Sequence, residues 1–334
     1  MRRRLLTSLG ALAIATTVPI MRASVAAQPP TADKGKTTAS KVYTPPRTAD
    51  GQPDLQGVWD FRNLILQPLE RPAQFATKEF LTEQEGAEFE KQAIERLEQS
   101  GPFITDDPTF WWDYSKKFVG GRRRSSLMID PPDGRIPPLT PEAKGRAALS
   151  GERRTRPAWG PEDRSVSERC ILGSNAGPPM LPGLYNNNVQ LFQTSGYVAI
   201  LNEMTHNIRI VPLDGRTALR VPQWSGSSRG HWDGNTLVVE TQGFRDSTSF
   251  QNSGPNMHLI ETFARVDPNT LLYTFTVSDP TTWAKPFTVQ FPMRKSDQLL
   301  YEYACHEGNY GMAALLRAAR VAENATAEAA KGSK

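Results

Sequence analysis

Apolar and polar residues alternate along most of the second half of the chain. Leu271, Tyr273 and Phe275 fall on one side of a two-residue repeat, and threonines occupy much of the other side. This period is typical of a β-strand that buries one face. Short turn sequences such as Asp233-Gly234 separate the alternating segments. The pattern predicts strands over residues 188–193, 197–203, 208–212, 228–232, 236–241, 257–266, 271–278, 286–293 and 298–304.

Helical spacing appears in three other places. Thr82 and Glu85 form a capping box before a predicted helix that ends at Gly101. A second helix is predicted to start at Thr140-Pro141-Glu142, and a third covers residues 312–323. Sequential strands with short links tend to form a meander that closes or folds over. We therefore expect a mainly β fold: an antiparallel meander that closes into a lipocalin-like β-barrel, or a sandwich, with helices and proline-rich loops outside it.

The N-terminus has the pattern of an export signal. Arg2-Arg3-Arg4 precedes an apolar stretch from Leu5 to Ile20, and small residues surround Ala27. These features predict a signal peptide over residues 1–27, of the Sec or the twin-arginine type, with cleavage near Ala27. The protein is then expected in the periplasm or outside the cell, with no membrane contact once the signal is removed.

The mature chain is expected to contain one domain. Residues 28–52 are rich in Pro, Thr, Ala and Lys, which predicts a flexible leader. Residues 53–323 are predicted to form the β-barrel domain, in which residues 53–185 wrap a strand-rich core at 186–306. Residues 324–334 are predicted to be a disordered tail.

Charge gives no indication of a nucleic-acid partner. The chain has 39 Lys and Arg and 35 Asp and Glu, but Arg2, Arg3, Arg4 and Arg22 lie in the predicted signal. The remaining basic and acidic residues balance, so the basic pI reflects the targeting segment. A small-molecule ligand or substrate is the partner that we expect, and the sequence leaves the oligomeric state open.

Cys170 and Cys305 are the two cysteines of the chain. In an oxidising compartment such a pair usually forms a disulfide. The sequence therefore predicts a bond between them, and two separate buried thiols are the alternative.

Histidines near carboxylates are the candidates for acid–base chemistry. The chain has four histidines, all in the strand-rich half. In a simple meander His258 and His306 fall at the same end, and His206 falls at the opposite end. Two histidines at one end of the barrel, with carboxylates nearby, favour general acid–base catalysis. The alternative is that these histidines are hydrogen-bonded polar side chains with a structural role only. The predicted catalytic residues are His258, His306, Glu307, Arg229 and Tyr310.

Other side chains are candidates for ligand binding. His206, Trp111, Trp112 and Trp283 are predicted to contact a ligand in an apolar pocket, although tryptophan is more often part of the core. No cofactor is predicted, because the sequence has no P-loop, dinucleotide fingerprint, C-x-x-C or H-E-x-x-H motif. No metal ligands are assigned, and a metal ion held by the histidines and their carboxylates is the alternative.

Several segments resemble a widespread family of exported bacterial proteins of unassigned activity. They are residues 129–141 (IDPPDGRIPPLTP), 209–216 (RIVPLDGR), 224–241 (WSGSSRGHWDGNTLVVET) and 301–310 (YEYACHEGNY). The resemblance covers most of residues 53–323 and implies the same architecture. It implies no catalytic residues. A more general likeness to lipocalin-like barrels comes from Gly57 and Trp59 at the head of a first strand.

Two functions fit these observations. The first is an exported enzyme, a lyase, isomerase or hydrolase, that acts on a small organic molecule in the mouth of a hollow barrel. His258 and His306 would serve as acid and base, Glu307 would orient one of them, and Arg229 would hold an anionic group. The alternative is a periplasmic binding or carrier protein for a small apolar or aromatic ligand.

Overall fold

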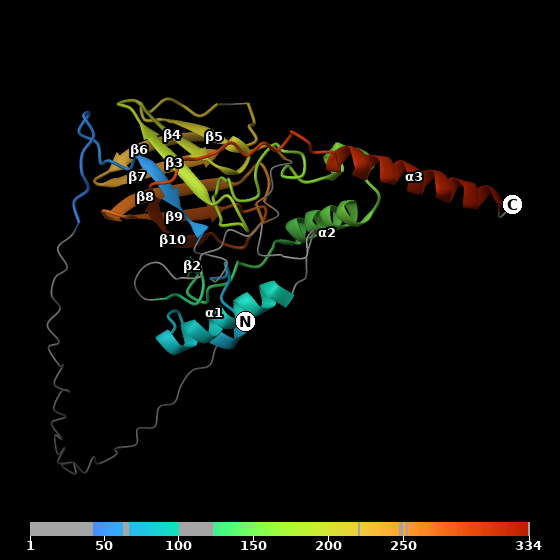
Figure 1. The fold of residues 1–334 in the computed structure, drawn as a ribbon, viewed down its shortest axis with the longest axis horizontal. Helices are drawn as coiled ribbons and strands as arrows, with labels where there is room; N and C mark the ends of the chain where they lie inside the picture. Colours follow the sequence, from blue (N-terminus) through green and yellow to red (C-terminus); the bar gives the residue numbers. More distant parts are fainter. Residues whose placement is uncertain are drawn as a thin grey trace, which may run out of the picture. The chain divides into compact units, whose positions relative to one another are not determined.

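Ten β-strands form one antiparallel sheet in the described part of the chain (Figure 1). The structure, a computed structural model, describes residues 43–62, 67–99, 123–219, 221–246, 250–251 and 253–332. The strands are β1 (Gly57–Asp60), β2 (Met128–Asp130), β3 (Asn188–Gln193), β4 (Tyr197–Asn202), β5 (Ile208–Pro212), β6 (Ser227–Asp233), β7 (Thr236–Gln242), β8 (His258–Asp267), β9 (Thr270–Ser278) and β10 (Phe287–Ser296). The α-helices α1 (Glu83–Gln99), α2 (Pro141–Thr155) and α3 (Gly311–Gly332) lie outside the sheet. Short 3-10 helices are η2 (Ala73–Phe75), η4 (Pro161–Asp163) and η5 (Met204–His206). The mainly β, antiparallel fold class is therefore confirmed.

The strand order is β5-β4-β3-β1-β10-β9-β8-β7-β6, with β2 also paired to β10. The expected single meander is thus two meanders, and β1 joins them by pairing with both β3 and β10. Two expectations were wrong. The 53–185 segment supplies strands to the sheet and is more than an outer cover. Residues 298–304 form no strand, because β1 and β2 occupy the side of β10 where that strand would have paired.

The sheet curls until its two edge strands, β5 and β6, lie next to each other. A Cβ atom on Gly230 of β6 would come within 2.8 Å of Val211 Cγ1 on β5 and 2.9 Å of Leu213 Cδ2. No backbone ladder joins Ile208–Pro212 to Ser227–Asp233, so hydrogen bonds do not close the sheet. The path holds nine strands, each antiparallel to the next, so β5 and β6 run in the same direction. We call this unpaired junction the seam.

Apolar side chains fill the interior next to β7–β10. On β9, and on β10 as far as Met293, every second residue is fully buried, as the two-residue repeat predicts. Tyr273 lies 5.0 Å from both Phe263 and Phe291, measured between ring centroids. Met180, from a proline-rich segment before β3, is also fully buried, and its backbone N–H donates to Tyr273 Oη at 3.1 Å. The hollow expected inside the barrel is therefore occupied by the core in this region.

The helix starts follow the capping chemistry of the sequence. Thr82 and Glu85 exchange hydrogen bonds, with Thr82 N donating to Glu85 Oε2 at 2.8 Å and Glu85 N donating to Thr82 Oγ1 at 3.2 Å. Thr140 Oγ1 accepts from Ala143 N at 3.1 Å at the start of α2. The third helix continues to Gly332, through most of the segment predicted as a disordered tail. None of the described helices is both long and apolar enough to span a membrane.

One further boundary differs from the sequence expectation. Residues 43–52, assigned to the flexible leader, form a turn in which Thr48 N donates to Gln52 O at 2.9 Å. The predicted signal peptide and the rest of the leader lie outside the described residues.

Candidate functional site

A pocket of about 350 Å³ lies at the seam between the two edge strands. Its lining residues are 171–172, 207–210, 219 and 223–229, which come from β5, β6, the crossover between them and a loop near Cys170. The pocket lies beside the first residues of the two edge strands, Ile208 of β5 and Ser227 of β6, which no ladder joins. Its volume is within the range of small-molecule sites.

Apolar side chains surround the opening of this seam pocket. Ile208 and Ile210 point outward from β5 and are 52% and 53% exposed, and Leu219 on the crossover is 60% exposed. Neighbouring large apolar side chains that remain this exposed are typical of an interaction site. The described lining residues include no Asp, Glu or His.

Trp224 is the aromatic side chain of the pocket, and two guanidinium groups lie near its ring. The Arg245 Cζ atom is 4.4 Å from the ring centroid, and the Arg169 Cζ atom is 5.8 Å from it. Such cation–π contacts help to hold an indole in place. The tryptophan was missing from the sequence prediction, although its motif was noted.

A buried ion pair forms the inner wall behind the pocket. Arg209 of β5 makes a bidentate pair with Glu261 of β8, with N–O distances of 2.6 and 2.9 Å. Tyr273 Oη donates to Glu261 Oε1 at 2.7 Å. Burial alone would lower the pKa of the Arg209 guanidinium, but the charge and hydrogen bonds of Glu261 raise that pKa. Burial raises the pKa of Tyr273 well above its ordinary value, and the Glu261 charge adds to this. Arg209 is therefore cationic and Tyr273 neutral.

Three nitrogen donors beside this ion pair have no hydrogen-bond partner among the described residues. They are Arg209 Nε, Asn207 Nδ2 and Asn202 Nδ2, and each atom is buried. Asn202 is 1% exposed because it continues the inward positions of β4, and its Oδ1 is also unpartnered. Buried donors are almost always satisfied. Asn207 and Arg209 line the pocket and Asn202 does not, and all three nitrogen atoms are buried out of contact with solvent.

Arg229, a predicted catalytic residue, holds the crossover over the pocket. Its Nε donates to Arg216 O at 2.9 Å, its Nη2 donates to Thr217 O, and its Nη1 donates to Ser228 O. Ser227 Oγ accepts from Leu219 N at 2.9 Å. These bonds fix the crossover on β6, so Arg229 positions the pocket wall.

His258, a second predicted catalytic residue, lies at the start of β8 with its side chain partly exposed. Its Nε2 is 2.5 Å from Glu240 Oε1 on the neighbouring strand β7. Glu240 was not among the predicted residues, because a long connection joins β7 to β8 and turn chemistry does not set their register. Glu261, close to His258 in sequence, instead points inward to Arg209.

The remaining predicted catalytic residues lie around the disulfide. His306 lines a pocket of about 280 Å³ with Cys170 and Asn309, while Glu307 is exposed and Tyr310 is 80% exposed. Within the described residues, no hydrogen bond or ion pair joins His306 to His258. Acid–base catalysis by this pair stays a prediction.

One prediction from strand direction was wrong, namely that His206 lies at the opposite end of the sheet from His258. Because β5 and β6 run in the same direction, the end of β4 and the start of β8 lie at the same end of the sheet. His206 therefore shares an end with His258. His206 is exposed and has a left-handed φ of 41°, next to Thr205 at 55°.

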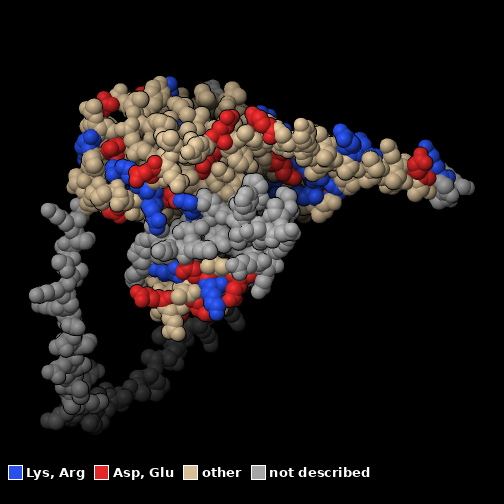
Figure 2. Space-filling view, in the orientation of Figure 1, with Lys and Arg blue, Asp and Glu red and all other residues tan. Residues whose placement is uncertain are grey.

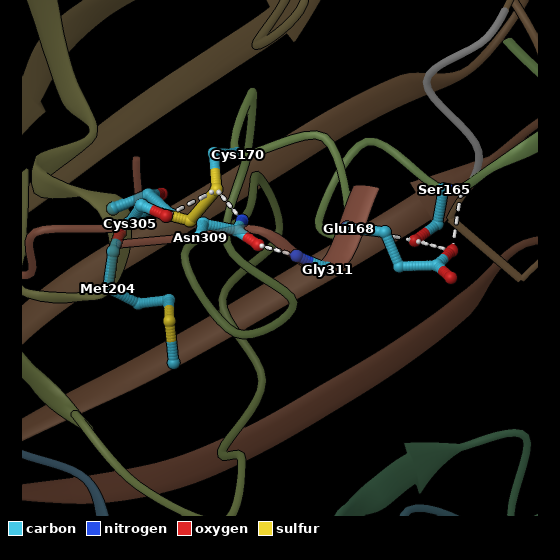
Figure 3. Close-up of a disulfide and its surroundings, with 8 residues drawn as sticks. Ser165, Glu168, Cys170, Met204, Cys305, Asn309 and Gly311 are labelled. Carbon is cyan, nitrogen blue, oxygen red and sulfur yellow. Dashed lines mark hydrogen bonds between the residues drawn. A yellow bond between two sulfur atoms is a disulfide. The ribbon is translucent and has the colours of Figure 1, made fainter. Parts of the chain in front are cut away.

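The predicted disulfide between Cys170 and Cys305 is confirmed. Figure 3 shows the bond, with Asn309 Nδ2 3.4 Å from Cys170 Sγ. Cys170 follows Arg169, which lies over Trp224, and precedes Ile171 and Leu172, which line the seam pocket. The bond therefore ties one wall of that pocket to the segment before α3.

The tryptophans predicted to bind a ligand fall in other places. Trp283 is 2% exposed and packs in the core, 5.1 Å from Phe287 between ring centroids. Trp111 and Trp112 lie outside the described residues.

Other comparisons give no independent indication of function. No group of three or more His, Cys, Asp or Glu among the described residues is placed to hold a metal ion. Positive and negative side chains are interspersed over the face in Figure 2, with no broad area of one sign. The chain matches no protein-family model and no curated protein sequence, so the resemblance to exported bacterial proteins stays a prediction.

Proposed function

We propose that the protein is an exported binding protein that holds a small, largely apolar molecule in the seam pocket. The observation that carries this proposal is the opening of the pocket, where Ile208, Ile210 and Leu219 are each more than half exposed. Burying such side chains contributes roughly 25 cal/mol per Å² of apolar surface removed from water. A ligand of matching size would supply that burial.

Binding is favoured over acid–base catalysis by the composition of the pocket. The described lining residues offer apolar surface, hydroxyls, amides and guanidinium groups, but no imidazole or carboxylate that would exchange a proton. Trp224 would stack on a ring or cover an alkyl chain.

The test is ligand extraction from native protein, with mass spectrometry, on the wild type and two tryptophan variants. Trp224→Ala removes the pocket aromatic. Trp159→Ala is the matched control, because Trp159 is a surface indole with Arg156 3.5 Å above its ring and lies outside the pocket lining.

We expect one compound to be retained at stoichiometric amounts by the wild type and by Trp159→Ala. Trp224→Ala should retain at least about tenfold less, as aromatic anchors at the centre of an interface typically contribute 2 kcal/mol or more. Equal retention by both variants, or no retained compound in the wild type, would contradict the proposal.

A further inference from the structure

A second pocket, which shares no described lining residue with the seam pocket, lies beside α2. Its volume is about 370 Å³, and most of its lining comes from one face of α2 and from residues 162–169. Counted from Arg146, the lining positions on α2 recur after three, four, seven and eight residues, which is the spacing of one helical face. We call this cavity the arginine pocket, after the five arginines of its lining: Arg146, Arg153, Arg154, Arg164 and Arg169.

The arginine pocket carries an excess of positive charge. Its five arginines face three lining carboxylates, which leaves two positive charges unbalanced. Two ion pairs link the lining to residues just outside it, and they add one charge of each sign, so the excess remains. The lining carboxylates are Glu162, Asp163 and Asp246, and the two pairs are Arg146 with Glu142 and Asp163 with Arg156. A ligand with two negative charges would balance this excess.

Arg153 and Arg154 are the arginines best placed to contact such a ligand. Both side chains are exposed, and neither forms a hydrogen bond or an ion pair with any residue that the structure describes. A guanidinium group offers a planar fork of N–H donors that matches the oxygens of a phosphate bidentately. These two forks line the pocket and are open to solvent, so ligand oxygens can reach them.

Arg164 removes an obstacle to anion binding at this end of α2. The C-terminal end of a helix carries a partial negative charge on its unpaired carbonyls. Arg164 Nη1 donates to Arg154 O at 3.4 Å and to Arg153 O at 3.5 Å. Its Nη2 donates to Arg156 O at 3.5 Å. The Arg164 guanidinium therefore offsets the charge of the helix end and ties residues 162–169 to α2, which shapes the pocket.

Part of the lining is apolar and suits an organic group. Leu149 of α2 is 59% exposed, and Val166 lines the wall formed by residues 162–169. A ligand with an apolar body would remove part of the Leu149 side chain from water, which favours binding.

We infer that the arginine pocket binds a small organic phosphomonoester, whose phosphoryl oxygens accept from Arg153 and Arg154 and whose apolar body contacts Leu149. A phosphomonoester carries close to two negative charges at neutral pH and three strong acceptor oxygens, which matches the excess charge and the two forks. A carboxylate has one charge and two oxygens and matches them less well. The inference is independent of the proposed function, because these three residues are not in the lining of the seam pocket.

Calorimetric titration of the full chain with three probes tests the ligand class. Phenyl phosphate and phenyl sulfate have the same ring and the same number of terminal oxygens, but phenyl sulfate carries one negative charge fewer. Inorganic phosphate lacks the ring. Near neutral pH we expect phenyl phosphate to bind about tenfold more tightly than phenyl sulfate and severalfold more tightly than inorganic phosphate. Equal affinities for the two phenyl esters would overturn the phosphate assignment, and equal affinities for the two phosphates would overturn the organic body.

Glutamine variants locate the binding. The paired variant Arg153→Gln, Arg154→Gln should weaken phenyl phosphate binding at least about tenfold, because both forks lose their charge. Arg317→Gln is the matched control, because Arg317 is an exposed helical arginine on α3 outside the lining of the arginine pocket. It should keep the affinity of the wild type.

A purely structural role for Arg153 and Arg154 predicts a different result. Cations in the last turn of a helix stabilise it through the helix dipole. If the paired variant lowered thermal stability but left phenyl phosphate affinity unchanged, the inference would be wrong. Binding that survived in the paired variant and was lost in Trp224→Ala would place the probe in the seam pocket, and would also overturn the inference. The two proposals therefore fail separately.

Discussion

The interior beside β9 and β10 and the interior beside the seam differ in how their polar groups are satisfied. Between β9 and β10 the ladder is continuous from Phe287↔Val277 to Arg294↔Thr270, and the inward side chains are almost all apolar. At the seam no ladder joins β5 to β6, and the inward wall carries the Arg209–Glu261 pair. Nearby buried donors such as Asn202 Nδ2 have no hydrogen-bond partner in the part of the chain that the structure describes.

This difference indicates a division of roles. Ladders and apolar packing stabilise the interior beside β9 and β10. The seam can therefore keep exposed strand edges and unsatisfied polar groups that would be too costly if the whole sheet contained them. Binding sites typically carry such local departures from good packing. We expect the seam to depend on the disulfide and on the buried Arg209–Glu261 pair, while the rest of the sheet is held by its ladders.

The largest effect should come from removing the disulfide, which fixes the seam wall covalently. The paired variant Cys170→Ala, Cys305→Ala should lose up to about 5 kcal/mol of unfolding free energy, since the bond closes a separation of 135 residues. Urea unfolding followed by circular dichroism measures this loss. Wild-type protein treated with reductant should have the same unfolding free energy as the variant. If reduction left the wild-type unfolding free energy unchanged, the disulfide would not stabilise the fold.

Breaking the buried ion pair should have the next largest effect. Glu261→Ala leaves Arg209 charged and unpaired in the interior, and should cost about 3–5 kcal/mol in the same urea experiment. The control is Glu240→Ala, which breaks the partly exposed pair with His258 and should change stability by less than about 1 kcal/mol. Similar losses for the two glutamates would mean that the wall behind the pocket is not a special environment.

The strand-rich half was largely predictable, because each strand is a local two-residue pattern ended by a turn. The repeat containing Leu271, Tyr273 and Phe275 gave both the strand and its buried face. The capping box was equally local, since Thr82 and Glu85 are three residues apart.

The topology and the site were not predictable, because both depend on contacts between distant segments. Trp59 of β1 is opposite Val189 on β3 and Lys295 on β10, and nothing near Trp59 in the sequence specifies those partners. Adding β1 to the path makes the edge strands parallel, which creates the seam and changes the end at which His258 lies. Arg209 and Glu261 meet across the interior for the same reason.

A third prediction concerns the close approach of the two edge strands. Gly230→Ala would place a methyl group within 3 Å of Val211 and Leu213, and should cost about 1–3 kcal/mol through overpacking. Gly145→Ala is the control, because the added methyl group meets nothing within 4 Å and the position is helical, so it should stabilise by up to about 1 kcal/mol. Thermal unfolding of both variants measures the two changes in stability. A neutral Gly230→Ala would indicate that the seam already opens freely.

The smallest effect on stability should come from the outer side of β5. Ile210→Ser changes a side chain that is 53% exposed, so the unfolding free energy should move by about 0.5 kcal/mol or less. Ligand affinity should nevertheless fall severalfold, because the apolar surface that the ligand covers is lost. Val211→Ser, one residue along and fully buried, should show the reverse: a loss of about 2–3 kcal/mol in stability. If Ile210→Ser reduced stability as much as Val211→Ser, the outer face of β5 would belong to the core and the seam would lose its distinction from the rest of the sheet.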